Sequence, residues 1–351
     1  MVSHALTTLA LLALAAVSGP LAQAMGLPLP YLLGPLAGSA LVATLAPHRL
    51  PPGYKFPQRL RLLFLAIIGL MIGAQVTPAL YAEVRQFPLS FAAVTVFVGL
   101  AHGIGYAILR HIGGYDTTTA LYASTPGGLY ESIAMGEAAG ADMNRLMIQQ
   151  FLRIVVVVTA LPLGLSLWIG EPVGSAGGMT LARADVPWSD LPLILAAGLG
   201  GLALGHLLRL PAGQMTGPMA LAALLSLTGW LGFDIPQWLV NLAQMVIGTA
   251  LGMRFTGLSR ALLLRGAGLS LLSVGAMLAL GAALALALHH ATGEAVDVLM
   301  ISLAPGGVTE MALVALSLQA NPAFVTLHHV YRILLTVVLL GLLTRLRRRT
   351  G

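Results

Sequence analysis

The chain has 351 residues, of which 58% are hydrophobic and only 9% are charged, and its formal net charge is +6. Soluble globular proteins carry about 25% charged residues, so this composition excludes an ordinary soluble domain and predicts an integral membrane protein. The hydrophobic segments do not alternate with period two, which excludes a membrane β-barrel. The absence of cysteine excludes disulfides, thiolate metal sites and thiol catalysis.

Hydrophobic windows predict six helical elements in each half of the chain. In the first half they span 5–24, 31–46, 60–76, 88–109, the interrupted segment 117–140, and 143–168. After a polar connection, 171–190, those of the second half span 191–208, 215–231, 238–253, 261–288, the interrupted segment 295–319, and 323–343. The first window lacks the basic region of a signal peptide, so we expect it to remain as a helix of the mature protein.

A Pro-Gly-Gly sequence interrupts one hydrophobic segment in each half, and a glutamate follows it. The first copy is Pro126-Gly127-Gly128 with Glu131, and the second is Pro305-Gly306-Gly307 with Glu310, so one constant offset in sequence relates them. The same offset relates Gly69 to Gly248, Gly73 to Gly252 and Arg153 to Arg332, whereas Gly34 and Gly217 correspond at a slightly larger one. These coincidences predict an internal duplication, with repeats at 1–170 and 191–351.

The distribution of lysine and arginine predicts how the repeats are oriented. If both interrupted segments enter and leave the membrane on one side, nearly all basic residues of the loops and of the C-terminal tail fall on the cytoplasmic side. If they cross fully, this bias is much weaker. We therefore predict an all-α polytopic membrane protein of two inverted repeats, in the cell inner membrane, with both termini cytoplasmic. Each repeat would have about five crossing helices and one Pro-Gly-Gly broken helix or re-entrant hairpin. In the alternative arrangement, which stays open, the interrupted segments cross the membrane and another short element does not.

The interruptions are the predicted binding site. A break inside the membrane frees backbone groups that must be buried in protein or line a watery cavity. The helix that follows each break directs its free N–H groups and the positive end of its dipole at that cavity, where an anion would be stabilised. The predicted substrate-binding residues are Ser124, Pro126, Gly127, Gly128, Pro305, Gly306, Gly307 and Thr309, together with Arg153 and Arg332. The alternative is that each break is only a kink.

Glu131 and Glu310 fall at the third position of the helices that follow the breaks. A carboxylate there can accept hydrogen bonds from the free N–H groups of its own helix, which would make it a structural cap. It can also bind a proton or Na⁺ and couple that ion to transport. Both roles stay open.

Arg153 and Arg332 are expected near the bilayer midplane, where an arginine is costly and normally has a partner. Each follows its glutamate at the same spacing along the chain, so the internal pairs Glu131–Arg153 and Glu310–Arg332 would brace each break. In the functional alternative, the arginines bind a carboxylate, a phosphate or a similar anion.

The two halves differ just before these arginines, because glutamines at 149–150 correspond to histidines at 328–329. A spacing of four places Gln149 on the face of Arg153 and His328 on the face of Arg332, so both are further candidates for ion coupling. A histidine there could titrate near neutral pH, and a packing role is the alternative.

The remaining signals carry less chemistry. His289 and His290 are expected in an external loop and lack the spacing of metal ligands, so we expect neither a metal nor a cofactor. The glycines of 198–201 follow no strand, and they predict close helix packing rather than a phosphate loop.

The motifs resemble those of the bacterial membrane family labelled AbrB, whose members carry a duplicated module. The resemblance rests on both Pro-Gly-Gly motifs with their glutamates, on the two Ile-Gly-x-x-x-Gly sequences and on the two arginines, and it spans nearly the whole chain. It implies the labels given to that family, regulator of gene expression or ammonia monooxygenase. The residues show neither a soluble DNA-binding module nor a cluster of copper or iron ligands. The arrangement is also similar to that of cation/proton antiporters and of bile-acid and citrate carriers.

From these observations we expect a secondary transporter or exporter of a small, anionic solute coupled to H⁺ or Na⁺, working by movement of the part that bears the breaks. The alternative is a membrane protein with an indirect role in regulation of gene expression. We expect no enzymatic activity and no direct nucleic-acid partner. The expected partners are the solute or ion and the lipid bilayer, and a homodimer is left open.

Overall fold

The structure is a computed structural model that describes residues 2–74, 76, 87–173, 190–210, 212–228, 235–258, 260–318 and 320–350. These residues form fourteen α-helices and no β-strand, which confirms the predicted all-α class. Most of the predicted polar connection, 171–190, lies outside the described residues. Within them, five helices are long and hydrophobic enough to cross a membrane, namely His4–Ala24, Pro88–Ile112, Met143–Ile169, Arg260–Thr292 and Pro322–Thr344.

The helix bounds follow the predicted windows closely. The first half contains α1 (Val2–Ala24), α2 (Pro30–Leu45), α3 (Gln58–Ala74), α5 (Phe87–Ala107), α6 (Thr117–Ala123), α7 (Leu129–Ala138) and α8 (Met143–Ile169). The second half contains α9 (Leu191–Leu207), α10 (Gly213–Leu227), α11 (Gln237–Gly252), α12 (Arg260–Thr292), α13 (Val296–Leu303), α14 (Val308–Ser317) and α15 (Pro322–Thr350). Each interrupted segment is therefore a pair of short helices, as predicted.

One boundary was wrong. His289 and His290, expected in a loop, lie in the last turn of α12. The helix continues past its hydrophobic window because the chain turns only at Gly293, which has a positive φ of 75° and whose N–H donates to the His289 carbonyl oxygen.

The chain divides into two compact units, and each unit combines segments from both halves of the sequence. Unit 1 comprises Met1–Leu80, Pro162–Gly257 and Ala312–Ala323, and unit 2 comprises Tyr81–Leu161, Leu258–Met311 and Phe324–Gly351. The units are not the predicted sequence repeats. Each repeat contributes its first three helices to unit 1 and its later helices mainly to unit 2.

In unit 1, the helices of the two halves pack against each other with exchanged partners. Helix α3 packs on α9 and α10, while α11 packs on α1 and α2. Within each half, α1 packs on α2 and α9 packs on α10. Exchanging α1 with α9, α2 with α10 and α3 with α11 leaves this set of contacts unchanged, which is the pattern that a two-fold axis between two repeats produces.

Glycines allow these helices to approach closely. A Cβ on Gly69 of α3 would collide with the Met215 carbonyl oxygen of α10, and one on Gly248 of α11 would collide with the Leu32 carbonyl oxygen of α2. Leu32 and Met215 correspond at the same offset in sequence as Gly34 and Gly217, so the two close contacts are equivalent. A Cβ on Gly201 of α9 would collide with Pro218 of α10, which confirms the predicted close packing at Gly201, whereas Gly198 and Gly200 would meet only ordinary contacts.

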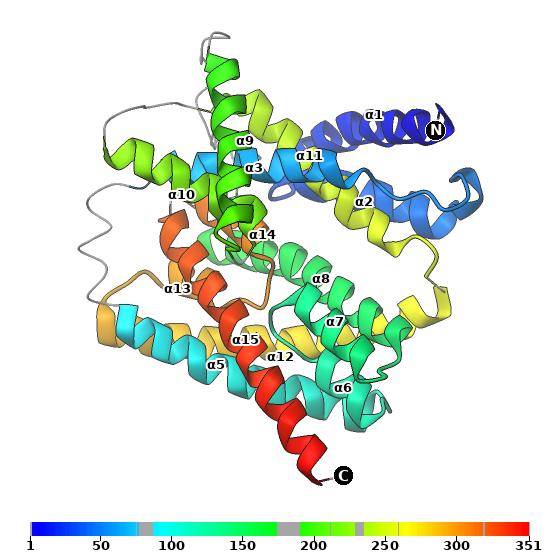
Figure 1. Ribbon diagram of the computed structural model, residues 1–351, viewed down its shortest axis with the longest axis vertical. Coiled ribbons are helices and arrows are strands. Elements are labelled where there is room, and N and C mark those ends of the chain that lie inside the picture. Colours follow the sequence, from blue (N-terminus) through cyan, green and yellow to red (C-terminus); the bar gives the residue numbers. More distant parts are fainter. Residues whose placement is uncertain are drawn as a thin grey trace. The chain divides into compact units, whose positions relative to one another are not determined.

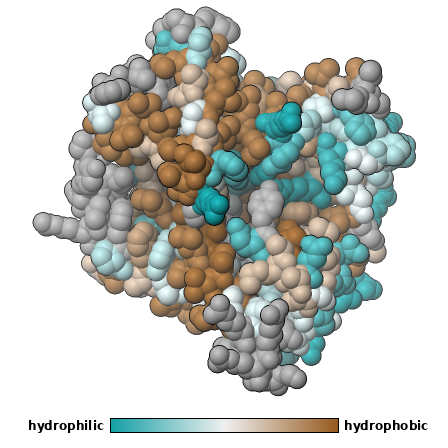
Figure 2. All heavy atoms as spheres, viewed as in Figure 1, coloured by the Kyte–Doolittle hydropathy of each residue, from teal (hydrophilic) through white to brown (hydrophobic). Residues whose placement is uncertain are grey.

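The outer faces of several helices are hydrophobic, as expected of a protein surrounded by lipid. On α9, Leu195 and Leu199 are 50% and 53% exposed, and Figure 2 shows hydrophobic atoms gathered over the region of α9 and α10. On α1, Leu9 and Val17 are exposed as well.

Unit 2 is built around α5 and α12, which pack against each other and each contact the first short helix of one interrupted segment, α6 or α13. Val94 and Phe97 of α5 share a buried cluster with Met277 of α12 and Leu303 of α13. Helix α15 borders this cluster through Leu335 and Leu339. The two interrupted segments are therefore held by the same helix pair.

The first interrupted segment returns to the end at which it starts. Helix α6 begins at its N-cap Asp116, whose carboxylate accepts hydrogen bonds of 2.9 Å from the N–H groups of Thr118 and Thr119. The hydroxyl of Thr119 accepts a hydrogen bond of 2.8 Å from the N–H of Asp142, which immediately precedes α8. The short helices α6 and α7 lie beside each other between these points (Figure 1). This course is that of a hairpin, whereas its orientation in a membrane stays a prediction.

Candidate functional site

The first break, residues 124–128, separates α6 from α7 inside unit 2. Pro126, Gly127 and Gly128 are all buried. Gly128 is the N-cap of α7 and has a φ of 61°, a left-handed conformation that favours glycine. Ser124 ends α6, and its hydroxyl donates to the Leu121 carbonyl oxygen at 3.1 Å, so it serves its own helix.

The second break, residues 304–307, separates α13 from α14. Pro305 and Gly306 are buried, while Gly307 and Thr309 are half-buried. A Cβ on Gly307 would collide with the carboxylate of Glu310, so glycine at this position leaves room for that side chain to fold back over the break.

Each break is held by the arginine predicted to lie beside it. Nη1 of Arg153 donates to the Thr125 carbonyl oxygen, and Nη1 of Arg332 donates to the equivalent Ala304 carbonyl oxygen. Nη2 of Arg332 also donates to the Gly306 carbonyl oxygen. Carbonyls at a helix end have no intrahelical donor, so the guanidinium groups supply the hydrogen bonds that the breaks remove. The two arginines therefore make equivalent hydrogen bonds in the two halves.

The predicted Glu131–Arg153 and Glu310–Arg332 pairs are wrong, because no ion pair joins these side chains in the described part of the chain. The physical reason is that the backbone carbonyls of the breaks, rather than the carboxylates, take the guanidinium donors. An ion pair does form nearby on α8, where Nε of the exposed Arg145 lies 3.3 Å from the carboxylate of Asp142.

Both glutamates occupy the third position of their helices, as predicted, because α7 begins at Leu129 and α14 begins at Val308. Glu310 is only 5% exposed, whereas Glu131 is half-buried. The carboxylates take part in no recorded hydrogen bond with the residues that the structure describes. The geometry therefore supplies no capping bond for either, and their role in ion coupling stays a prediction.

One arginine also reaches the break of the other half. A Cβ built on Gly127 would lie 3.3 Å from Nε of Arg332 and 3.3 Å from Oγ1 of Thr336. Helix α15, from the second half, thus packs directly on the first break. Arg153 donates to the Thr125 carbonyl oxygen of the same break, so side chains from both halves meet at the first break.

Each of the two guanidinium groups has an N–H group that is not hydrogen-bonded within the described residues. Arg153 is 6% exposed and Arg332 is 1% exposed. In both, the buried Nε–H group has no hydrogen-bond acceptor among the described residues. Two buried cations with unused donors and no acidic partner form an environment that an anion would stabilise.

Gln149 and His328 lie in unit 2, and their hydrogen-bond partners lie outside the two breaks. Nε2 of Gln149 donates to the Tyr115 hydroxyl at 3.0 Å and to the Gly266 carbonyl oxygen at 3.3 Å. His328 has its ring nitrogens 2.8 Å from the Phe324 carbonyl oxygen and 2.7 Å from the Ser90 hydroxyl. None of these partners belongs to a break, and the predicted coupling role of the two side chains is untested.

Their neighbours Gln150 and His329, which the sequence did not single out, bind the short helices that lead into the breaks, and Gln150 also donates to Thr125 of the first break. Nε2 of Gln150 lies 3.0 Å from the Tyr122 carbonyl oxygen, and Nε2 of His329 lies 2.9 Å from the Ile301 carbonyl oxygen. Tyr122 and Ile301 correspond at the same offset in sequence as the two breaks do. Residues three and four before an arginine both lie on its side of a helix, so spacing alone could not choose between them.

At the first break, the hydroxyl groups of Thr125 and Ser132 form further hydrogen bonds that the second break lacks. The Thr125 and Ser132 hydroxyls are 2.7 Å apart, and Nε2 of Gln150 donates to the Thr125 hydroxyl at 2.7 Å. The equivalent positions in the second half are Ala304 and Met311, which have no hydroxyl. The first break is therefore hydrogen-bonded internally where the second is apolar.

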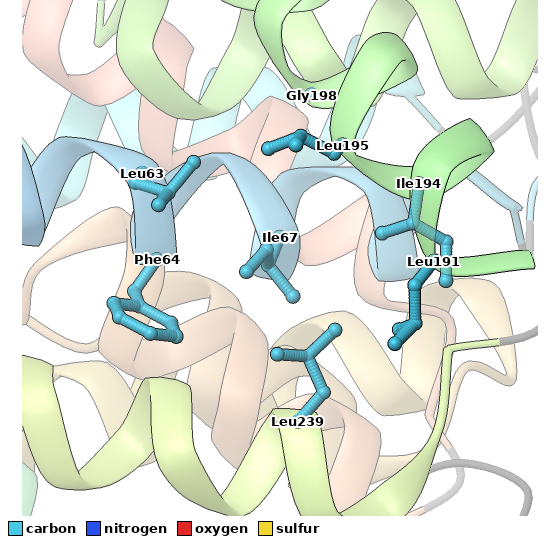
Figure 3. A pocket seen from close by; sticks show the side chains of 8 residues that line it. All are labelled: Leu63, Phe64, Ile67, Leu191, Ile194, Leu195, Gly198 and Leu239. Atoms are coloured by element: carbon cyan, nitrogen blue, oxygen red, sulfur yellow. The ribbon is translucent and has the colours of Figure 1, made fainter. Parts of the chain in front are cut away.

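Unit 1 contains a cavity lined by apolar side chains. Between α3, α9 and α11 lies a cavity of about 220 Å³ whose lining carries no ionisable group (Figure 3). Its lining residues are Leu63, Phe64, Ile67, Leu191, Ile194, Leu195, Gly198 and Leu239. Among the described residues, no group of three or more His, Asp or Glu side chains is placed to hold a metal ion. The two buried arginines of the described chain, Arg153 and Arg332, lie instead at the breaks of unit 2.

The sequence is similar to known proteins over most of its length. A protein of Escherichia coli (strain K12) named "Putative regulator AbrB" is 28% identical over 319 residues, which cover 91% of this chain and 89% of that protein. A Bacillus subtilis (strain 168) protein named "Uncharacterized protein YhjN" is 24% identical over 351 residues, covering 94% of this chain and 90% of that protein. A family model described as "Transition state regulatory protein AbrB" matches residues 41–348. The chain therefore belongs to the AbrB family, as its motifs predicted.

Proposed function

We propose that the protein is a secondary transporter or exporter of a small, anionic solute, coupled to H⁺ or Na⁺, in the cell inner membrane. The observation that carries this proposal is the pair of buried arginines at the breaks, whose Nε–H groups have no acceptor in the described part of the chain. A buried, uncompensated charge is costly, so a site with two of them favours an anion as its ligand.

The backbone at the breaks supports the same ligand. Helices α7 and α14 begin at the breaks, where their first N–H groups and the positive ends of their dipoles favour an anion, beside the carboxylates of Glu131 and Glu310. Irregular backbone at membrane depth is tolerated where it lines a cavity, and transporters place binding sites at such half-helices. Because both breaks belong to unit 2, we propose that movement of this unit carries the solute.

Uptake into proteoliposomes tests the proposal. Wild-type protein is reconstituted and given labelled sulfate, phosphate, acetate or succinate under an imposed proton or sodium gradient. We expect accumulation of at least one of these anions, lost in Arg153→Gln, Arg332→Gln and Glu310→Gln. Arg145→Gln is the matched control, because Arg145 lies on the same helix as Arg153 but is 40% exposed and pairs with Asp142.

The outcomes separate two errors. Uptake at the wild-type level in folded Arg153→Gln and Arg332→Gln variants would show that the site is misplaced. Absence of uptake of every anion under both gradients, by wild-type protein that remains monodisperse, would argue against transport of small anions. Arg→Lys variants, which keep the charge but lose the forked donors, serve where a glutamine variant fails to fold.

A role in regulation is the second candidate, because the family description and the Escherichia coli relative's name both refer to regulation. We propose that any such role is indirect, through a solute that the protein moves, without a direct nucleic-acid partner or enzymatic activity. A soluble partner that co-purifies with the wild-type protein through a cytoplasmic loop would favour direct regulation instead. The lipid bilayer surrounds the protein in either case, both termini are proposed to be cytoplasmic, and a homodimer is left open.

A further inference from the structure

The two halves also differ where Gln150 and His329 bind the short helices α6 and α13, which lead into the breaks. The two side chains sit at equivalent positions and make equivalent contacts, from Nε2 to the carbonyl oxygens of Tyr122 and Ile301. Both side chains are completely buried. The imidazole of His329 can take up a proton, whereas the amide of Gln150 cannot, so equivalent positions in the two halves differ in whether they can be protonated.

We propose that His329 is the proton-binding residue of the anion site, so that a proton on His329 and an anion between Arg153 and Arg332 bind together. This inference rests on the proposed transport of an anion. It names H⁺ as the coupled ion and replaces His328 by His329 as the histidine that carries it.

Hydrogen bonding fixes where the proton goes. A carbonyl oxygen only accepts hydrogen bonds, so Nε2 of His329 must carry a proton and donate it to Ile301. The neutral ring therefore keeps a lone pair on Nδ1. That atom is buried and has no hydrogen-bond partner in the described part of the chain. Protonation adds one H⁺ to Nδ1 and leaves the bond to Ile301 intact.

The surrounding charges couple this proton to an anion. On α15, Arg332 follows His329 by about one helical turn, and His328 is adjacent. Helix α13 contributes the Ile301 carbonyl. Arg332 also lies at the first break, where Arg153 of α8 donates to the Thr125 carbonyl oxygen, and the carboxylates of Glu131 of α7 and Glu310 of α14 lie against Gly128 and Gly307. A proton on His329 adds a positive charge one helical turn from the buried guanidinium group of Arg332, which is unfavourable until an anion arrives. By linkage, each ligand then raises the affinity for the other by the same factor.

The structure also offers matched controls. His328→Gln removes the neighbouring histidine, whose ring nitrogens face Phe324 and Ser90 rather than a break. His102→Gln removes another buried histidine of unit 2, in α5, whose ring nitrogens have no hydrogen-bond partner among the described residues. His329→Gln reproduces the side chain that the first half carries at this position and keeps an N–H donor for the Ile301 carbonyl.

The test is a proton count during anion binding. Purified protein in detergent is titrated with sulfate, which does not take up protons in this range, and with succinate, at about pH 6 and about pH 8. Calorimetry in two buffers of different ionisation enthalpy gives the number of protons bound with each anion. For wild-type protein we expect net proton uptake and an affinity that falls by up to about tenfold per pH unit as the pH rises.

In His329→Gln we expect anion binding without proton uptake and with little pH dependence, while His328→Gln and His102→Gln behave like the wild type. Wild-type proton uptake in a folded His329→Gln variant, or its loss in His328→Gln, His102→Gln or Glu310→Gln instead, would overturn this inference and leave the anion site standing. Failure of the wild type to bind either anion would contradict the proposed function itself, and this inference with it.

Discussion

The two breaks of unit 2 share one framework and differ in chemistry. In each, an arginine from the long helix that follows holds the carbonyl oxygen of the residue before proline. The first break adds a chain of hydrogen bonds through Gln150, Thr125 and Ser132. The second replaces these hydroxyls by Ala304 and Met311 and its glutamine by a histidine. The comparison teaches that the arginine–carbonyl contacts are shared by the two breaks, whereas the side chains that surround them differ: hydroxyls and a glutamine at the first break, apolar groups and a histidine at the second.

The largest effect is expected from removing the arginines that hold the carbonyl oxygens of the two breaks. Arg332→Ala and Arg153→Ala should each abolish anion uptake, and Arg332→Ala should be the less stable, because it frees two break carbonyls while Arg153→Ala frees one. An unsatisfied buried carbonyl costs about 1–3 kcal/mol. Thermal unfolding of the purified variants in detergent measures the difference. Equal or reversed stabilities would show that the break carbonyls find other donors.

The hydroxyl chain of the first break gives the next prediction. Thr125→Ala removes one of the acceptors of Gln150 and the partner of the Ser132 hydroxyl, which is buried, so we expect a loss of about 1–3 kcal/mol in unfolding free energy. Ser124→Ala is the control, because the Ser124 hydroxyl bonds only within its own helix. If both variants unfold alike, the first break does not depend on this chain.

A smaller effect distinguishes how the two interrupted segments begin. Asp116→Ala should cost about 1 kcal/mol, since Asp116 caps α6 through two backbone N–H groups. The N-cap of α13 is Ala295, which forms no side-chain cap hydrogen bond, so Ala295→Gly is expected to change stability much less. Thermal unfolding again provides the measurement. An effect of the same size at both positions would contradict the assigned cap.

The smallest expected effect on stability concerns the glutamates. Glu131→Gln should change the unfolding free energy by no more than about 0.5 kcal/mol, because Glu131 is only half-buried and its carboxylate makes no hydrogen bond in the described structure. Glu310→Gln should not lower it, because this change removes a charge from a buried position without removing a hydrogen bond in the described structure. A loss near about 1 kcal/mol, as for other helix caps, would restore the capping role. A stable Glu310→Gln variant is also what the uptake experiment needs, because it separates loss of function from loss of fold.

Much of this arrangement could be predicted from the sequence. Hydrophobic windows bounded by proline and glycine located the helices, and the constant offset between the repeats located both breaks and both arginines. Local patterns suffice for these features because helix ends depend on nearby residues. The exchanged packing in unit 1 was not predicted: Gly69 and Gly248 indicated close contact, but nothing near them in the sequence identifies Met215 and Leu32 as the partners.

The site residues show the same limit. The sequence placed Arg153 and Arg332 at the breaks but paired them with glutamates, because a backbone carbonyl at a break carries no sequence signal. It chose Gln149 and His328 where Gln150 and His329 make the contacts, since the rotation of a helix within a bundle is decided by packing. The asymmetry between the halves was visible in the sequence, and its position relative to the breaks required the structure.

Equilibrium binding of labelled sulfate and succinate to the purified protein tests the central claim most directly. The account predicts saturable binding of at least one anion by the wild type and by Arg145→Gln, and its loss in Arg153→Gln and Arg332→Gln variants that remain folded. Wild-type protein that binds neither anion, or folded arginine variants that bind as tightly as the wild type, would contradict it.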